Sequence, residues 1–455
     1  MLRVLVKLIL LFIWFSSPFL YANNQNNNIM GPLWLSSSPE FQDLKNDLEI
    51  AKNIGINAVT IDVWWGAVEK SADQSFNWSY YDKVFNLIES KDLKIIPIMS
   101  FHQCGGNVGD DCNIKLPKWI WSHFKNIENK TLMYKSEQGN YSKEYISLWA
   151  DTLIMSQYIE FMQAFKNHFK HKAHLFDEIN ISMGPAGELR YPSYNSHDNN
   201  SGYPTRGSVQ SYGKLAVEDF QQNMKQKYHT IKQLNKAWEQ KYTKFNHIKP
   251  PEDMAQFISK GKHLNTQFGK DYFSWYHQAL IDHGTRILQA ADIAFNDTFS
   301  DIQLGYKVAG IHWLMAKNGH LNRAAEIASG IIPTNLASTN SSLSYQKAIS
   351  IAKKGKTVNR QVVLHFTCLE MSDNPTAPAY SKAQTLVNWI SQEANKQNVI
   401  IKGENALAAG ILNNHGWNNI ETAFEQGIYS GLTILRLNNI RSKIVQKRYA
   451  EFIKK

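Results

Sequence analysis

The sequence contains the run Gly184-Pro185-Ala186-Gly187-Glu188-Leu189-Arg190-Tyr191-Pro192-Ser193-Tyr194, which directly follows the apolar residues Ile179, Ile181 and Met183. The apolar residues predict a buried strand, and the glycines and proline predict the loop that ends it. A glutamate in such a loop points into the cleft that the strand ends define. We therefore expect Glu188 to lie in a cleft at a strand exit.

A second strand with the same kind of exit lies near the C-terminus. The apolar residues 399–401 are followed closely by Gly403 and Glu404. Two carboxyl groups at two strand exits are the minimum for hydrolysis of a glycosidic bond, because one protonates the leaving oxygen and the other activates water or attacks carbon. The pair therefore makes glycoside hydrolysis the first functional hypothesis.

Strands and helical segments alternate along the whole chain. Apolar residues recur at helical spacing from Ser38 to Gly55 and again over 81–88. With the two strands described above, eight are predicted in all. They lie at 33–35, 58–66, 94–102, 176–183, 303–311, 362–366, 399–402 and 431–437. Eight such units with largely apolar strands predict a closed parallel (β/α)₈ barrel, a TIM barrel, whose active site lies at the C-terminal strand ends. An open doubly wound sheet is the alternative, but no glycine-rich phosphate turn follows the first strand.

The long polar connections at 185–265 and 313–360 are expected to be loop insertions on the catalytic face, and no repeat or linker marks a second domain. The first residues are cationic, residues 8–15 are apolar, and Ala22 is small, which is typical of a secretory signal peptide over 1–22. A retained membrane anchor is the alternative, but a span needs roughly 20 apolar residues. We expect residues 23–455 to form one secreted or periplasmic catalytic domain without a membrane partner.

The formal net charge is +10, and the basic excess is scattered. No aromatic-basic motif accompanies it, so a solvated surface is favoured over nucleic-acid binding. Three cysteines are too few for a disulfide scaffold. Cys104 and Cys112 share a glycine-rich loop, where an exported protein permits a disulfide, and Cys368 would then be a free thiol. A metal site that adds His102 to the first two fits no common zinc spacing.

Polar residues stand at most of the predicted strand exits. A lone polar residue at such a place is usually a hydrogen-bonded structural residue. Folding does not require polar residues at so many exits, so together they favour a binding cleft. They are Asp62, His102, Asp110, Lys307, His312, Thr367, Cys368, Glu370 and Arg436.

Longer motifs extend this pattern. By them the chain resembles the β-amylases, glycoside hydrolase family 14, over nearly its whole mature length. The motifs are DVWWG at 62–66, SFHQCGGNVGD at 100–110, GPAGELRYPSY at 184–194, GIHW at 310–313, FTCLEM at 366–371 and GENAL at 403–407. The segment GDDCN at 109–113 is similar to the bacterial branch, whose members close a disulfide there. Bacterial relatives often carry a C-terminal starch-binding domain, which we do not expect in this chain.

The resemblance implies an exo-acting enzyme that removes maltose from the non-reducing ends of α-1,4-glucans such as starch, glycogen and maltodextrins, with inversion of the anomeric carbon. It implies Glu188 as the general acid and Glu404 as the general base. It also implies that Asp62, His102 and Asp110 hold the terminal glucose, with Asp110 on a loop that closes over the sugar. The further substrate contacts that it implies are Lys307, His312, Thr367, Asn405, Ala406, Arg436 and the apolar Leu407, and Thr367 is also implied to support the base.

The resemblance implies no cofactor for catalysis, but it does imply a candidate structural calcium site. The matching set is Glu69, Asp73, Gln74, Gln157 and Glu160. Calcium gains from negative charge, so the glutamine at 157, where those relatives carry a carboxylate, weakens the site. We expect a monomer. Two alternatives stay open: an inactive glucan-binding relative, and another barrel glycosidase with retaining chemistry, whose carboxyl groups would lie about 5–5.5 Å apart instead of about 6.5–9.5 Å.

Overall fold

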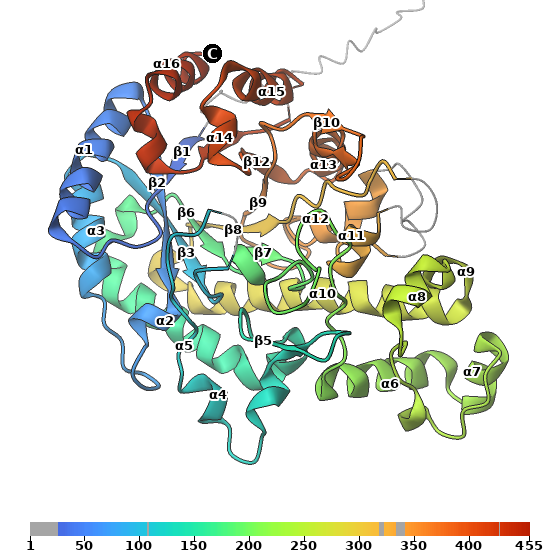
Figure 1. Ribbon diagram of the computed structural model, residues 1–455. Helices are drawn as coiled ribbons and strands as arrows, with labels where there is room; N and C mark the ends of the chain where they lie inside the picture. The colour runs from blue at the N-terminus through green and yellow to red at the C-terminus, as the bar shows by residue number, and fades with distance from the viewer. Residues whose placement is uncertain (1–25, 107–108, 318–322, 334–341, 427) are drawn as a thin grey trace, which may run out of the picture.

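A computed structural model describes residues 26–106, 109–317, 323–333, 342–426 and 428–455, and a closed barrel of parallel strands forms its centre (Figure 1). The barrel strands in spatial order are β1 (Asn26–Met30), β2 (Ala58–Trp64), β3 (Lys94–Ser100), β6 (Glu178–Ile181), β8 (Gln303–Val308), β9 (Val362–Phe366), β12 (Ile400–Glu404) and β13 (Gly431–Ile434). Strand β13 pairs with β1, which closes the sheet. The predicted TIM barrel is confirmed.

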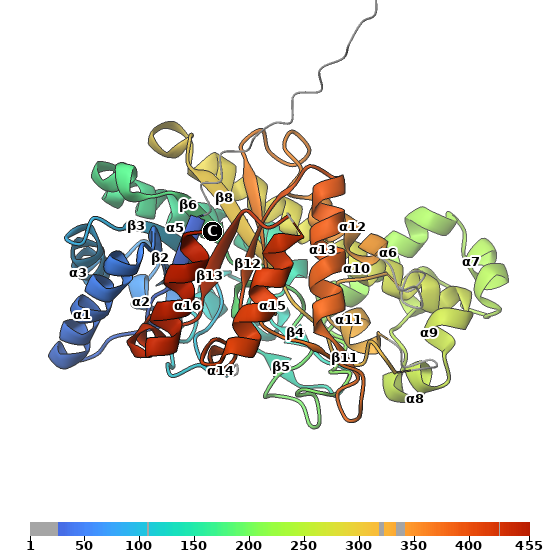
Figure 2. The ribbon, with the colours of Figure 1, turned by 90° about the horizontal axis from the view of Figure 1, so that it is seen from above.

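Helices form a layer around these strands (Figures 1 and 2). The longer ones are α1 (Ser38–Ile54), α3 (Ser79–Glu89), α5 (Asp151–Phe169), α10 (Gln267–Ala294), α13 (Ala383–Lys396), α15 (Asn414–Glu425) and α16 (Lys443–Ile453). Helix α1 begins at a capping box in which Ser37 is the cap and Glu40 is its partner. The helix ends at Gly55, which is in the left-handed conformation. Among the helices in the described ranges, none is long and apolar enough to cross a membrane.

The first strand was predicted wrongly at 33–35, because the true strand begins with three asparagines, a residue that is depleted in strands. Asn28 is nevertheless fully buried, and its carbonyl accepts a hydrogen bond from the Tyr449 hydroxyl at 2.7 Å. This strand is stabilised by pairing on both sides, with β2 and β13. The predicted signal peptide lies outside the described residues.

The barrel strands alternate between an apolar outer face and a polar inner face. Outward residues such as Ile61, Ile179 and Leu304 belong to the one large apolar core that the helices cover. Several inward residues of the barrel strands are polar yet buried: Asp62, Asn180, His365, Lys402 and Glu404, with Lys307 partly buried beside them. TIM barrels are typically filled by branched apolar side chains, so this interior is unusual. This polar interior continues up to the C-terminal ends of the strands.

The two predicted insertions carry the helices that lie outside the barrel layer. The first contains the strand β7 (Glu188–Leu189), which pairs with β8, and the lobe α6 (Lys214–Tyr228), α7 (Ile231–Trp238), α8 (Met254–Ser259) and α9 (Lys262–Asn265), which extends to one side in Figure 1. The second contains α11 (Ala324–Ala328) and α12 (Gln346–Ser350). Residues 318–322 and 334–341 of this insertion lie outside the described ranges. The remaining short elements are α2 (Trp65–Val68), α4 (Ile120–His123), α14 (Ala408–Ile411) and the hairpins β4–β5 (Tyr134–Lys135, Tyr141–Ser142) and β10–β11 (Asp373–Asn374, Ser381–Lys382).

Candidate active site

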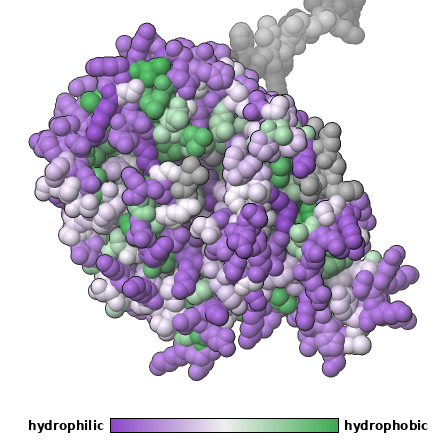
Figure 3. Space-filling model, viewed as in Figure 1, coloured by the Kyte–Doolittle hydropathy of each residue, from purple (hydrophilic) through white to green (hydrophobic). Residues whose placement is uncertain are grey.

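A cavity of about 520 Å³ lies over the C-terminal ends of the barrel strands. The face of the molecule in Figure 3 is mainly hydrophilic. Its apolar patches are small and scattered among the residues drawn in colour. Every residue that the sequence singled out for catalysis or substrate binding lines the cavity: Asp62, His102, Asp110, Glu188, Lys307, His312, Thr367, Glu404, Asn405, Ala406, Leu407 and Arg436. The structure therefore brings together residues from all parts of the chain.

Glu404 ends β12 and lies between two cationic groups. Its Oε2 accepts a hydrogen bond from Lys307 Nζ at 2.7 Å, and its Oε1 lies 3.3 Å from His365 Nδ1. Burial alone would raise the pKa of this carboxyl, but the positive charge of Lys307 and the contact with His365 outweigh burial and lower the pKa to about 2. Glu404 is therefore a carboxylate near neutral pH, the state that a general base needs.

Glu188 follows the tight turn at 184–187 and has a different set of partners. Its Oε2 accepts hydrogen bonds from Arg190 Nε at 2.8 Å and from the Tyr194 hydroxyl at 3.2 Å. The turn needs glycine at 184, because a Cβ there would lie 2.5 Å from the carbonyl oxygens of Glu188 and Arg190. The motif thus places the carboxyl group and the side chains that orient it within one short segment.

The polar residues beside the cavity are held by partners from neighbouring strands. The Ser100 hydroxyl donates to Asp62 Oδ1 at 2.8 Å. His102 Nδ1 lies 2.8 Å from the Ser182 hydroxyl, and burial lowers the pKa of His102 to about 3. Burial likewise lowers the pKa of His312 to about 4. Both imidazoles are therefore neutral near pH 7 and offer hydrogen bonds without charge.

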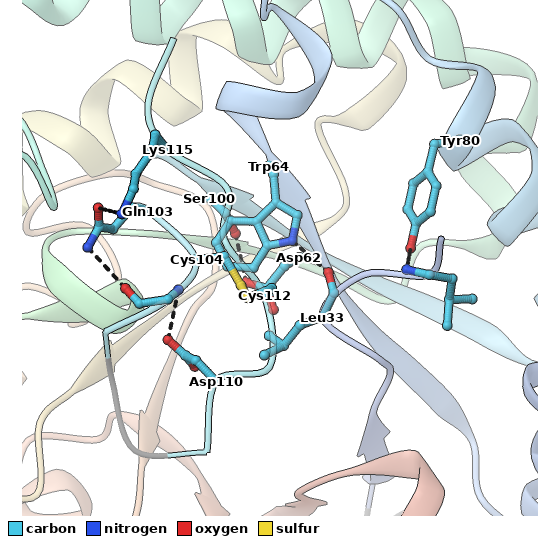
Figure 4. The surroundings of a disulfide bond; sticks show 12 residues. Leu33, Asp62, Trp64, Tyr80, Ser100, Gln103, Cys104, Asp110, Cys112 and Lys115 are labelled. Atoms are coloured by element: carbon cyan, nitrogen blue, oxygen red, sulfur yellow. Dashed lines mark hydrogen bonds between the residues drawn. A yellow bond between two sulfur atoms is a disulfide. The ribbon is translucent and has the colours of Figure 1, made fainter. Parts of the chain in front are cut away.

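The disulfide between Cys104 and Cys112 joins the two ends of the loop that carries Asp110 (Figure 4). Asp110 Oδ2 accepts a hydrogen bond from the backbone N–H of Gly105 at 3.0 Å. The predicted pairing is confirmed, and Cys368 is a free and buried thiol. Closing so short a loop stabilises the fold by about 2–3 kcal/mol in the chain-entropy model. Residues 107–108 lie outside the described ranges, so closure of this loop over a sugar stays a prediction.

The segment after Glu404 is anchored by a residue to which sequence reasoning assigned no role. The carboxylate of Glu370 accepts hydrogen bonds from the backbone N–H groups of Ala406 at 2.9 Å and Leu407 at 2.8 Å. Thr367, expected to support the base, accepts a hydrogen bond from the N–H of Cys368. The groups that hold Glu404 are Lys307 and His365 instead.

Sequence reasoning also missed several residues that orient the predicted ones. They are Ser100, Ser182, Arg190, Tyr194 and His365. Ser100, Arg190 and Tyr194 lie inside the motifs quoted above, so their place in a motif was a usable signal. Ser182 and His365 lie in none of these motifs and are identified only by the residues that face them across the barrel.

The candidate calcium residues do not form a metal site in this structure. Glu69 accepts hydrogen bonds from the Trp65 indole at 2.6 Å and from the backbone N–H of Gln74 at 2.5 Å, so both of its oxygens are already used. Burial, and then the nearby Asp73 and Glu160, raise the pKa of Glu69 to about 7. Within the described parts of the chain, no three His, Cys, Asp or Glu side chains are grouped to hold a metal ion.

Comparisons with known proteins agree along the whole barrel. A family model described as glycosyl hydrolase family 14 matches residues 28–454. The chain is 37% identical to a thermophilic β-amylase of Thermoanaerobacterium thermosulfurigenes over 90% of this chain and 70% of that protein. It is 38% identical to a β-amylase of Cytobacillus firmus over 92% of this chain and 83% of that protein. The crystal structure of the catalytic domain of β-amylase from Paenibacillus polymyxa superposes with a TM-score of 0.81 at 36% identity, covering 95% of this chain and 98% of that one.

Proposed function

Because the chain belongs to glycosyl hydrolase family 14, we propose that it is a β-amylase that releases β-maltose from the non-reducing ends of α-1,4-glucans such as starch. The observation that carries the proposal is the single cavity in which Glu188 and Glu404 stand in different environments. Two carboxyl groups with different surroundings are the arrangement from which acid and base roles arise.

In this mechanism Glu188 is the general acid. Arg190 and Tyr194 both contact its Oε2, which leaves Oε1 to carry the proton. That proton passes to the glycosidic oxygen as the bond to the anomeric carbon breaks, so the departing glucan leaves as an alcohol. The two donors fix the direction in which the carboxyl group presents its proton.

Glu404 is the general base that completes the reaction. It removes a proton from a water molecule, which attacks the anomeric carbon on the face opposite the leaving group. Lys307 and His365 keep it ionised for this step. Attack from the opposite face inverts the anomeric centre, so the product is β-maltose.

The remaining lining residues bind the end of the glucan. Asp62, His102 and Asp110 are proposed to hold the hydroxyls of the terminal glucose. The neutral His102 would do so through hydrogen bonds without carrying a charge. The other proposed substrate contacts are Lys307, His312, Thr367, Asn405, Ala406, Leu407 and Arg436. The proposal of exo-action rests on the family to which the chain belongs.

The product of the first turnovers tests the proposal. Proton NMR of a maltoheptaose digest, recorded faster than mutarotation, is expected to show β-maltose as the first new sugar. Gel filtration of a starch digest should show long chains persisting while maltose accumulates. An initial α-anomer would indicate a retaining enzyme, oligosaccharides of random length would indicate an endo-acting cleft, and binding without any product would indicate an inactive relative.

We also propose that residues 1–22 are removed as a signal peptide and that the protein acts as a secreted or periplasmic monomer. The support is the cationic start, the short apolar run and Ala22 in the sequence. A disulfide at Cys104 and Cys112 is compatible with an oxidising compartment. Neither a nucleic-acid partner nor a membrane partner is part of the proposal.

For calcium we propose at most weak, structural binding at Glu69, Asp73, Gln74 and Glu160. A buried oxygen of Asp73 has no hydrogen-bond partner among the described residues, which is the one feature that favours a cation. We expect about 1 mM calcium to raise Tm by about 1 °C or less, as a site near half saturation would. The variant Gln157→Glu adds a carboxylate and should enlarge the rise. A loss of kcat in EGTA would contradict a purely structural role.

A further inference from the structure

A row of charged side chains runs from the cavity, which Lys307, His365 and Glu404 line, into the barrel interior. Lys402 Nζ lies 2.7 Å from Glu178 Oε2, and the other oxygen of Glu178 contacts His365 Nε2. The opposite ring nitrogen, His365 Nδ1, lies 3.3 Å from Glu404 Oε1, and Glu404 Oε2 accepts a hydrogen bond from Lys307 at 2.7 Å. The five residues come from β6, β8, β9 and β12, and their charges alternate in sign along the row.

The row is poorly explained as a source of stability. Removing charges from water is expensive, and apolar residues of similar volume often stabilise a core as well as a buried ion pair does. The barrel nevertheless keeps room for these charges. A Cβ at Gly305 on β8 would lie 2.3 Å from Glu178 Oε1 and 2.0 Å from Asn180 Oδ1, so the glycine provides the space that the carboxylate occupies. The barrel interior therefore leaves space for the side chain of Glu178.

His365 has a carboxylate on each side of its ring. A neutral imidazole has only one N–H and would leave one of two buried carboxylates facing a lone pair, whereas an imidazolium presents an N–H to both. The contact between His365 Nδ1 and Glu404 at 3.3 Å is an ion-pair contact without the alignment of a hydrogen bond. Burial opposes the charge, but Glu178 and then Glu404 overcome burial and raise the pKa of His365. Lys402 contacts the other oxygen of Glu178, the one that does not face His365, and offsets part of the negative charge of this carboxylate.

The other charged groups around the base have also to be counted. Lys307 on β8 lowers the pKa of Glu404. On β2, burial raises the pKa of Asp62, the nearby Arg436 and Lys307 lower it, and the charge of Glu404 raises it. His365 is therefore the second cation at the base, and it is the one that Glu178 and Lys402 support from below.

We propose that His365 works as an imidazolium, held by Glu178, and is a positioning residue that keeps Glu404 oriented and ionised as the base. The inference rests on the proposed role of Glu404. It adds to that role three residues, His365, Glu178 and Lys402, that act through the base and are not proposed to bind the glucan.

The variant His365→Asn tests the proposal through the pH dependence of kcat/KM. The asparagine keeps a polar side chain but removes the cation, so the pKa of Glu404 should rise and the acid limb should move to higher pH. An opposite charge at this distance changes the pKa of a carboxyl group by about 1–3. Because Lys307 remains, we expect the pKa of Glu404 to rise by about 1. The basic limb should not move, and the loss of activity should fall on kcat more than on KM.

A matched control and a second variant keep the test decisive. His277 is as buried as His365, each being 1% exposed, and its Nδ1 contacts only a backbone carbonyl, that of Gly330. His277→Asn should lower Tm without moving either limb. Glu178→Gln removes the carboxylate that holds the imidazolium, and should move the acid limb in the same direction as His365→Asn. If His365→Asn does not fold, the double variant Lys402→Met/Glu178→Gln removes a neutral pair and should give the same shift.

NMR of histidine labelled with ¹⁵N reads the charge directly. The signal that is absent from a folded His365 variant belongs to this residue. We expect it to have the shift of an imidazolium at pH 8 in the wild-type protein and of a neutral ring in Glu178→Gln. An acid limb that stays within about 0.2 pH unit of wild type in His365→Asn, or a neutral ring in the wild-type protein, would overturn the inference while leaving the β-amylase assignment intact. Full activity of Glu404→Gln would instead overturn the role of the base itself.

Discussion

Glu188→Gln and Glu404→Gln are each expected to lower kcat by about 10²–10⁴-fold, the usual contribution of a general acid or base, while leaving the fold and oligosaccharide binding measurable. Each glutamine keeps the size of the side chain, and in Glu188→Gln the contacts from Arg190 and Tyr194 can be retained through the amide oxygen. The measurement is kcat on maltoheptaose, with circular dichroism and calorimetric titration of maltose to show that structure and binding persist.

The two variants are expected to differ on an activated substrate. Fluoride leaves without protonation, so Glu188→Gln should recover much of its activity on maltosyl fluoride, whereas Glu404→Gln should not, because water still needs a base. Glu421→Gln is the matched control, since Glu421 pairs with Arg448 and does not line the cavity. Turnover of one third of the wild-type value in either catalytic variant would contradict the role assigned to that glutamate.

Lys307→Met is expected to cause the second largest loss, about 10²–10³-fold in kcat/KM. Its ammonium lies 2.7 Å from Glu404 Oε2, so the variant leaves a buried carboxylate without its strongest cationic partner and also removes a proposed contact to the glucan. Removal of a cation raises the pKa of Glu404, so the acid limb of the pH profile should move to higher pH. The full profile of kcat and KM measures both effects.

The control for this variant is Lys347→Met. Lys347 is exposed and contacts Gln278 at 2.6 Å, so its loss should change neither activity nor Tm appreciably. If Lys307→Met matched the wild-type enzyme near pH 7 and its acid limb stayed in place, the assignment of Lys307 as the partner that keeps the base ionised would be wrong.

Most of the barrel follows from local sequence patterns, and the exception has a clear reason. Strands such as β3 and β9 are short, apolar and bounded by turn signals, so their positions could be predicted. The first strand could not, because Asn26–Asn28 has the composition of a loop. Its pairing with β2 and β13 and the polar barrel interior make an asparagine strand stable, and both are properties of the closed sheet rather than of the segment.

The site divides in the same way. Residues that lie in long motifs, such as Glu188 and Glu404, could be placed from the sequence and do line the cavity. Their partners come from other strands, and contacts such as His365 with Glu404 depend on how the closed barrel brings non-consecutive segments face to face. For the candidate calcium residues, both oxygens of Glu69 accept hydrogen bonds within the protein, whereas one buried oxygen of Asp73 has no partner among the described residues, so cation binding there stays a prediction.

The polar inner face of the barrel determines where this enzyme can be engineered for heat tolerance. Substitutions that enlarge apolar packing in the middle of the barrel would displace the ions that serve the reaction, so gains in durability there would be offset by lost turnover. The outward residues of the same strands pack against helices in one continuous apolar core. A directed-evolution library confined to that outer shell should yield more robust variants with unchanged product and pH optimum.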